Sequence, residues 1–263
     1  MAKARMMFDM TVRDVEEGLR ETQTVILPVG IVEQHGYHLP LSVDVHNAVE
    51  IARRASERTG CFVTPPVHYN FSGGTLPGTI NISPQVFSLM LMDILQSLVM
   101  QGFRRIVVLL GHAGSESQVA ARDAAHYFLR LRPDVPGLVI CVVPFTRLSP
   151  SIQRAMEGGD YHAGFYETSL MLYWKPELVA LDRAEMDEPE VAEMMRTGPD
   201  AYAVAERRTG CPFEVPRVVQ DPRIRVGVMG DYSGANARTG EQIAGECVDA
   251  LEAIIRQMEE AAR

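Results

Sequence analysis

The stretch TVILPVGIVEQHGYHLPLSVDVHNA, residues 24–48, contains the features that decide the fold. It begins with an apolar run over 24–32 that is rich in β-branched residues, as is typical of a strand buried on both faces of a parallel sheet. A helical pattern follows over 46–58. Three histidines, one glutamate and one aspartate lie within 29–48, around the junction of the two patterns. The stretch therefore predicts an α/β fold with ligand-type side chains at a strand end.

The same alternation of strand and helix patterns continues along the chain. Three more apolar runs predict buried parallel strands at 61–69, 104–111 and 138–145. Helical spacing of apolar residues predicts three further helices at 84–101, 115–131 and 239–262. Pro84 suits the first turn of its helix, and Ser115 or Ser117 is predicted to cap the next one. Alternation of this kind predicts a sheet that is covered by helices on both faces.

The segment 182–224 departs from this pattern because it is richer in charge and proline. We interpret it as an insertion that contains a helix around 187–196, and not as a linker to another domain. A chain of 263 residues with 46% hydrophobic and 22% charged side chains has enough material for one large core. A single domain over 1–263 is therefore predicted.

Composition also restricts location and partners. No run of about 18 apolar residues occurs, so neither a membrane span nor a signal peptide is expected, and a cytoplasmic protein is predicted. The four cysteines form no CxxC pair, which favours reduced, mostly buried thiols. A net charge of −9 argues against broad binding of nucleic acid, so a small-molecule substrate is expected.

Ligand-type side chains follow two of the predicted strands. Glu33 and His35 are two residues apart after the first strand, so in an extended chain both leave the same face. Asp44 lies next to the following helix, and His112 comes directly after the third strand. The carboxyl ends of parallel strands share one edge of the sheet, where ligands bind. These four side chains are therefore expected to converge.

Carboxylate oxygen and imidazole nitrogen together suit Zn²⁺, Mn²⁺ or Fe²⁺, and a carboxylate with two oxygens can bridge two cations. Asp44 is the candidate bridge. The alternative is an aspartate that caps a helix beside hydrogen-bonded loop histidines. The joint occurrence of these residues with DYHAGFYETS, 160–169, favours the metal site.

Five motifs carry a resemblance to a known family. They are LPVGIVEQHGYHLPLSVD, TLPGTINISP, LLGHAGS, YHAGFYETS and GVMGDYSGANARTGEQ, in that order along nearly the whole chain. Together they resemble the creatininase family, also called the creatinine amidohydrolase family. The resemblance implies a three-layer αβα sandwich with a mainly parallel central sheet, assembly as a homohexamer, and two divalent metal ions per chain.

The resemblance also implies roles for single residues. Glu33 and His112 would bind one metal, His35 would bind the other, and Asp44 would bridge them. His162 would carry a proton to the leaving group. An imidazole is suited to that role because its ordinary pKa of about 6.5 lets it act as both base and acid.

Two departures from the family pattern concern the substrate. Gly114 stands where creatinine-hydrolysing members have a glutamate, and Glu167 is predicted to complete the second site and to take part in catalysis, with Glu116 as the alternative. Gly158 stands where those members have a pocket tryptophan, and the single tryptophan is Trp174, in an expected helix. Both departures argue against creatinine itself as the substrate.

The predicted function is that of a dinuclear metal-dependent hydrolase. A hydroxide bridging the two ions would cleave a C–N bond of a small amide, cyclic amide or formamide. One alternative is hydrolysis of a C–C bond in a cyclic polyhydroxy diketone, as in family members that open oxidised inositols. The other is a non-catalytic, metal-stabilised binding protein. The glycine-rich segment 71–79 either covers the substrate or serves only as a connection.

Overall fold

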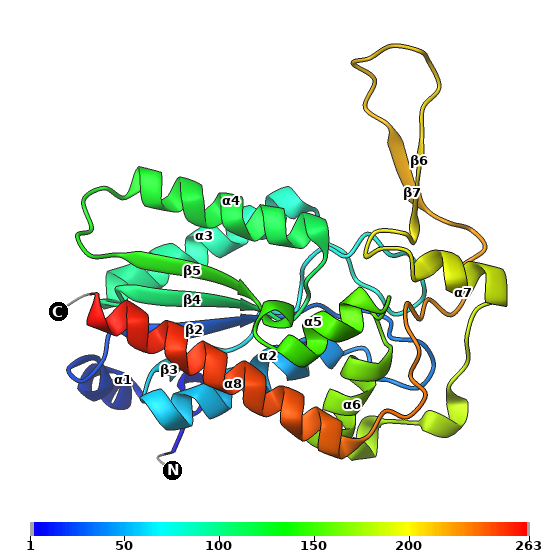
Figure 1. The fold of residues 1–263 in the computed structure, drawn as a ribbon. Helices are drawn as coiled ribbons and strands as arrows, with labels where there is room; N and C mark the ends of the chain where they lie inside the picture. The colour runs from blue at the N-terminus through cyan, green and yellow to red at the C-terminus, as the bar shows by residue number, and fades with distance from the viewer. Residues whose placement is uncertain (1–2, 262–263) are drawn as a thin grey trace.

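The computed structural model describes residues 3–261 and is built on a five-stranded parallel sheet (Figure 1). The strand order is β1-β3-β2-β4-β5, and every pairing between neighbours is parallel. The strands are β1 Arg5–Met6, β2 Thr24–Val29, β3 Phe62–Val63, β4 Arg105–Leu110 and β5 Val139–Pro144. Strands β2 and β4 pair along their full length and form the centre of the sheet.

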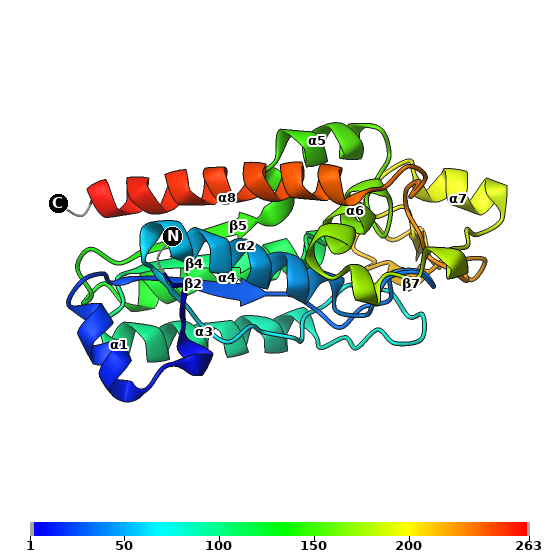
Figure 2. The same ribbon diagram turned by 90° about the horizontal axis from the view of Figure 1, so that it is seen from below.

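Helices cover both faces of this sheet, as the two views of the ribbon show (Figures 1 and 2). The α-helices are α1 Val12–Leu19, α2 Val43–Thr59, α3 Pro84–Gln101, α4 Ser115–Leu131, α5 Pro150–Glu157, α6 Phe165–Trp174, α7 Pro189–Met195 and α8 Ala237–Glu260. Short 3₁₀ helices are η1 Met7–Asp9, η2 Phe145–Arg147, η3 Pro176–Leu178 and η4 Leu181–Arg183.

The side chains of β2 alternate between two hydrophobic layers because successive residues of a strand point to opposite faces. Val25 and Leu27 pack in a cluster with residues of α3 and α4. Ile26 packs in the other cluster, with residues of α2, α6 and α8. The predicted three-layer αβα sandwich with a mainly parallel sheet is confirmed.

The helices at 84–101 and 115–131 have the predicted bounds. Pro84 occupies the first turn after the N-cap Ser83, as predicted. The capping prediction for α4 was wrong, because its N-cap is Gly114 and no side chain caps it. The long strand predicted at 61–69 is interrupted: Phe62–Val63 forms the strand β3, the prolines at 65–66 break it, and parallel pairing resumes in an isolated bridge between Val67 and Val29.

Two further sequence predictions need correction. The run at 138–145 is not fully buried, because β5 is an edge strand, and Val139 is exposed. The four thiols are free, but only Cys61 and Cys247 are buried, while Cys211 is exposed.

The segment 182–224 contains the expected helix, α7, and also an antiparallel hairpin that was not predicted. Its strands, β6 Ala203–Glu206 and β7 Arg217–Gln220, project from the body as an arm (Figure 1). The tip exposes Phe213 and Val215 almost fully. The two strands are only four residues long, and their sequences AVAE and RVVQ do not alternate between apolar and polar residues, so no strand was predicted there.

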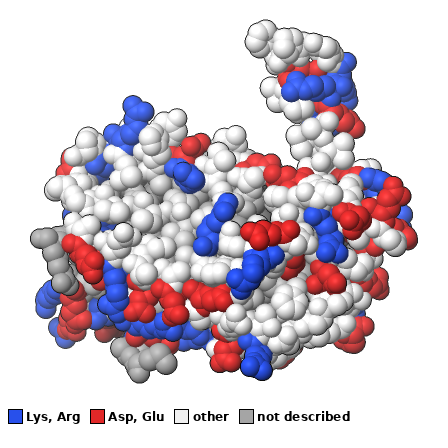
Figure 3. Space-filling view, in the orientation of Figure 1, with Lys and Arg blue, Asp and Glu red and all other residues white. Residues whose placement is uncertain are grey.

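Basic and acidic side chains are interspersed on the face seen in Figure 3, without a broad basic patch. Among residues 3–261, no helix combines the length and apolarity needed to cross a membrane.

Candidate metal centre

Five ligand-type side chains lie together at the carboxyl edge of the sheet. Glu33 and His35 come from the segment after β2, Asp44 from the first turn of α2, His112 from the residue pair after β4, and Glu167 from the first turn of α6. All five are buried. Sequence reasoning placed four of them at strand or helix ends. The structure arranges the five in two overlapping groups described below, and His162 forms a third group with Glu33 and His35.

Two glycines allow the start of α2 to approach these strand ends. A side chain at Gly30 would place its Cβ 2.6 Å from the backbone nitrogen of Val45. A side chain at Gly111 would collide with the backbone carbonyl of Asp44. Because neither glycine has a Cβ, Asp44 reaches the ends of both central strands.

The first ligand group contains Glu33, Asp44 and His112. Nδ1 of His112 lies 3.1 Å from Oε2 of Glu33 and 3.7 Å from Oδ2 of Asp44. The donor atoms of the group lie within 4.8 Å of one another, as they must if one ion is to contact all three.

The second ligand group contains His35, Asp44 and Glu167. Nε2 of His35 lies 3.7 Å from Oδ1 of Asp44 and 3.7 Å from Oε2 of Glu167. Nδ1 of His35 is 3.1 Å from the backbone carbonyl of Glu33 and donates to it, since a carbonyl can only accept. The lone pair of His35 therefore lies on Nε2, facing the two carboxylates.

Several of these buried atoms have no hydrogen-bond partner among the described residues. They are Oε2 of Glu33, Nε2 of His35, Oδ2 of Asp44 and Nε2 of His112. Buried polar atoms are normally paired, so a cluster of unpaired donors to metal calls for a ligand. Carboxylate oxygens with imidazole nitrogens are a donor set that Zn²⁺, Mn²⁺ and Fe²⁺ accept, and the residues present fit divalent cations.

Burial dominates the electrostatics of the cluster. Burial raises the pKa of Asp44 to about 8, although His112 opposes the rise. Burial also raises the pKa of Glu167 to about 8 against the effect of His35. Burial lowers the pKa of His112, but Glu33 and Asp44 outweigh it and raise the value to about 9. Without cations, protons compensate the clustered charge, and binding of cations would release them.

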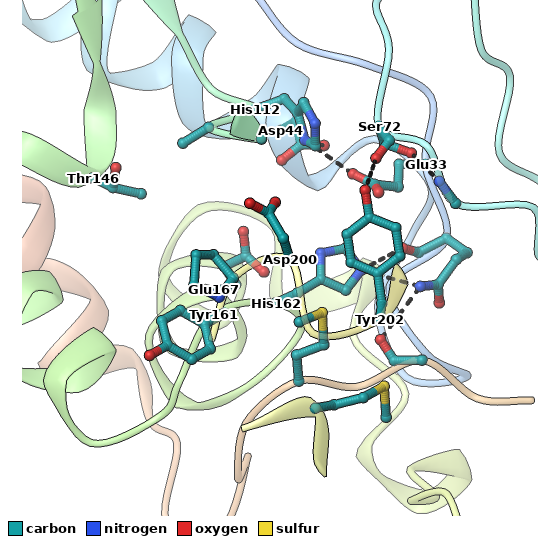
Figure 4. A pocket seen from close by; sticks show the side chains of 18 of the residues that line it. Glu33, Asp44, Ser72, His112, Thr146, Tyr161, His162, Glu167, Asp200 and Tyr202 are labelled. Atoms are coloured by element: carbon teal, nitrogen blue, oxygen red, sulfur yellow. Dashed lines mark hydrogen bonds and ion pairs between the residues drawn. The ribbon is translucent and has the colours of Figure 1, made fainter. Parts of the chain in front are cut away.

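His162 lies against the cluster, and its backbone pairs with that of Met229. Its ring centroid is 4.2 Å from that of His35. Nε2 of His162 is 2.8 Å from the carbonyl oxygen of Gln34 and donates to it. The other ring nitrogen, Nδ1, is left to exchange a proton and points toward the pocket (Figure 4). Burial, aided by the charge of His35, lowers the pKa of His162 to about 4.

The N-terminus of α6 is held so that Glu167 faces the cluster. Oε2 of Glu167 accepts a 2.6 Å hydrogen bond from the backbone nitrogen of Ala163. Ala163 has a φ of 55°, the one positive value among the described residues other than glycine. Oδ2 of Asp160 accepts from the backbone nitrogen of Tyr166 at 3.0 Å. Side chains at Gly164 or Gly230 would collide with Asp160, so the close packing requires glycine.

The alternative ligand, Glu116, does not join either group. Its Oε2 accepts a hydrogen bond from the hydroxyl of Ser115. Gly114 precedes them, and a Cβ there would come 2.5 Å from Nε2 of His112. Trp174 lies outside the pocket, where Nε1 donates to Oδ1 of Asn47 at 3.1 Å.

The remaining pocket wall comes from the glycine-rich segment 71–79, for which a substrate-covering role was one of two expectations, and from the insertion, to which no motif gave a role. Ser72 and Leu76 of the glycine-rich segment line the pocket, as does Tyr202 of the insertion. The hydroxyl of Tyr202 donates to the backbone carbonyl of Ser72 at 2.7 Å and joins these two segments (Figure 4). No local signal marked the insertion as a pocket wall, because its packing depends on residues about 130 positions away.

Residues 8–255 match the sequence profile of the family described as creatininase, creatinine amidohydrolase. A creatinine amidohydrolase of Pseudomonas putida is 30% identical, covering 98% of this chain and 98% of the relative. A mycofactocin precursor peptide peptidase of Mycolicibacterium smegmatis is 32% identical over 86% of this chain and 81% of the relative. A 3-dehydro-scyllo-inosose hydrolase of Thermotoga maritima is 29% identical over 69% of this chain and 60% of the relative.

Solved structures give the same result. A crystal structure of creatinine amidohydrolase (creatininase) superposes with a TM-score of 0.79 at 27% identity, covering 97% of this chain and 98% of that chain. A creatininase variant described as of Zn–Zn type gives a TM-score of 0.78 at 28% identity with the same coverage.

Proposed function

The chain belongs to the creatinine amidohydrolase family of hydrolases, and from this membership and the metal centre we propose that it is a dinuclear metal-dependent amidohydrolase. Its reaction would cleave a C–N bond of a small amide, cyclic amide or formamide. The observation that carries the proposal is the position of Asp44, whose oxygen Oδ1 lies 3.7 Å from Nε2 of His35 while Oδ2 lies 3.7 Å from Nδ1 of His112. One carboxylate between two sets of ligand-type side chains is the arrangement that two neighbouring cations require.

In this proposal, Glu33 and His112 would hold one cation, His35 and Glu167 would hold the other, and Asp44 would be a ligand of both; these residues form two of the groups whose ligand atoms lie within 4.8 Å of one another. Divalent cations bound there would supply Lewis acidity, which polarises a carbonyl oxygen and lowers the pKa of water toward 7. Zn²⁺, Mn²⁺ and Fe²⁺ all suit the donor set.

His162 would act as the general base and then as the general acid of the reaction. Nε2 is committed to the carbonyl of Gln34, so Nδ1 would take a proton from the attacking water and pass it to the leaving nitrogen. The hydroxyl of that water adds to the carbonyl carbon, the C–N bond breaks, and the nitrogen leaves with the proton. Apolar side chains, including Met195 and Met229, would restrict the access of bulk water.

A second candidate function is hydrolysis of a C–C bond in a cyclic polyhydroxy diketone. It is favoured by the similarity to the inosose hydrolase of T. maritima and by a pocket without a tryptophan among the described lining residues. A non-catalytic metal-stabilised binding protein is the third possibility. The half-buried His162 argues against it, since a structural site would need no proton carrier.

The deciding experiment is turnover by purified protein reloaded with Zn²⁺, Mn²⁺ or Fe²⁺. Lactams, formamides and keto-inositols should be assayed side by side, with chelator-treated protein as the control. Metal-dependent turnover of a lactam or formamide supports the amidohydrolase. Turnover of the keto-inositols alone would support hydrolysis of a C–C bond instead. No turnover of any of these compounds would favour the non-catalytic binding protein.

We further propose that the chain acts as a single domain in a cytoplasmic homohexamer. Free thiols are in keeping with a reducing compartment. Light scattering on protein eluted from a size-exclusion column measures the mass of the assembly. A mass below that of six copies would contradict the hexamer.

A further inference from the structure

Aspartates and glutamates are the main ionisable side chains of the pocket lining, beside His112 and His162. Its lining contains the carboxylates of Glu33, Asp44, Glu167 and Asp200, and no lysine or arginine among the described residues. The first three are assigned to cations in the proposed function. Asp200 is exposed, and it makes no ion pair with a described lysine or arginine.

A second carboxylate shares the side-chain hydrogen-bond partner of Asp200. The hydroxyl of Ser115 lies 2.8 Å from Oδ1 of Asp200 and 3.0 Å from Oε2 of Glu116. A hydroxyl has one proton and can donate to only one of the two carboxylates at a time. The two exposed carboxylates therefore share one donor, and their combined negative charge would attract a cation.

The position of Asp200 is set by its neighbours. The backbone nitrogen of Ala203 donates to the carbonyl of Asp200 at 3.1 Å, and that of Ala201 donates to the carbonyl of Gly198 at 3.2 Å. Tyr202, between these residues, is tied to the glycine-rich segment through the carbonyl of Ser72. Asp200 lines the same pocket as Asp44 and Glu167 (Figure 4).

Apolar side chains line much of the remaining surface. They are Leu76, Phe145, Met156, Met195, Ile224 and Met229. Three of the six are methionines, whose flexible thioethers adapt to irregular apolar groups. The pocket therefore has unpaired metal-ligand atoms at its floor and apolar side chains along its wall. Its exposed edge carries the carboxylate of Asp200 and is called the mouth.

We propose that the pocket selects amides that carry an ammonium or guanidinium group attached through a short apolar stem, with Asp200 as the specificity-determining carboxylate. This inference rests on the proposed function, because the scissile carbonyl must lie at the metal centre. The stem would then lie along the methionine wall, and the cation would contact Asp200. Substrates with a negative group at this end would be repelled.

Three hydroxamates of matched length test the inference by binding, so the natural substrate need not be identified first. Aminohexanohydroxamic acid ends in ammonium, heptanohydroxamic acid in methyl, and adipic monohydroxamic acid in carboxylate. The hydroxamate group of each compound chelates the cations, and the group at the opposite end of the compound lies at the mouth. Calorimetry on metal-loaded protein should show the ammonium compound binding about 5- to 30-fold tighter than the methyl compound, with the carboxylate compound weakest.

The variant Asp200→Asn should bring the ammonium-to-methyl ratio of affinities close to one. Glu116→Gln should lower the ratio by a smaller factor. Asp182→Asn removes the same charge from an exposed site outside the pocket and should leave the ratio unchanged. Raising the salt concentration should lower the ratio of the wild-type protein, because the pair at the mouth is accessible to ions.

Equal affinities of the three hydroxamates for the wild-type protein would overturn the inference and leave the proposed function standing. A ratio that survives Asp200→Asn would also overturn it. Failure of all three to bind metal-loaded protein would contradict the proposed function and the inference together.

Discussion

Oδ1 of Asp44 lies 3.7 Å from Nε2 of His35, within a buried site where that nitrogen has no hydrogen-bond partner among residues 3–261. The other oxygen, Oδ2, lies 3.7 Å from Nδ1 of His112. One short side chain therefore faces two histidines that come from different strand ends. Either a proton shared among these groups or bound cations would compensate the negative charge of the carboxylate. Only cations would also give the histidine nitrogens a partner.

The shared position of Asp44 predicts an asymmetry in metal content. Protein purified without chelator should contain two divalent ions per chain. Asp44→Ala should lose both, whereas His35→Ala should lose mainly one, because only a shared ligand touches both ions. Elemental analysis measures the content, and Asp182→Ala serves as a control at an exposed aspartate. Equal partial loss in the Asp44 and His35 variants would remove Asp44 from the bridging role.

His162→Ala should keep both metals and lower turnover about 10²- to 10⁴-fold, the usual contribution of general acid–base catalysis. The side chain donates to the carbonyl of Gln34 and is not assigned as a ligand, so the fold and the metal content should persist. Turnover of the substrate found in the screen and elemental analysis measure the two effects. Loss of a metal would make His162 a ligand, and full activity would make Glu167 or a water chain the proton carrier.

Gly111→Ala should destabilise the protein by about 1–3 kcal/mol, because the added methyl collides with the carbonyl of Asp44 and displaces the start of α2. The metal content of the Gly111→Ala variant should also be lower than that of the wild type. Gly245→Ala, in the interior of α8, meets no atom within 4 Å and should stabilise the protein by about 0.5–1 kcal/mol. Urea unfolding of both variants measures the difference. Equal stability of the two would show that close approach at Gly111 is not needed.

Glu246 predicts a pH-dependent contribution to stability far from the metal centre. Burial opposes ionisation, but hydrogen bonds from Ser149, Gln242 and Ser151 outweigh it and lower the pKa of Glu246 from 4.5 to about 2. A lowered pKa in the folded state means that the contribution is fully present above about pH 4.5 and is lost as the pH falls toward 2.

The variant Glu246→Gln should therefore cost about 1 kcal/mol at pH 7, and its difference from the wild type should shrink between pH 4.5 and the acid limit of folding. Urea unfolding at several pH values measures this difference. Glu241→Gln, at an exposed position on the same helix, is the control. A difference that does not change with pH would mean that Glu246 acts through packing and not through its charge.

The sequence predicted a helix or strand well where residues within that element, or at its ends, mark it. The helix at 84–101 begins at Pro84 and ends before Gly102 in the left-handed conformation, so both ends are marked in the sequence. Strands β2 and β4 were recognised because both are buried on two faces and are therefore apolar at every position after the first. Helices α1 and α5 and the hairpin were missed, since each is short and takes its stability from contacts made elsewhere.

The sequence by itself determined the family and the chemical types of the site residues, because each motif is a contiguous run whose letters do not depend on folding. Only the tertiary structure decided that Glu167 and not Glu116 lies with His35, that Asp44 lies between His35 and His112, and that Asp200 lines the pocket. These relationships join residues from distant segments, and their distances are set by how helices pack on the sheet. Glycines at the points of close approach make that packing possible, but a sequence alone does not say which atoms they admit.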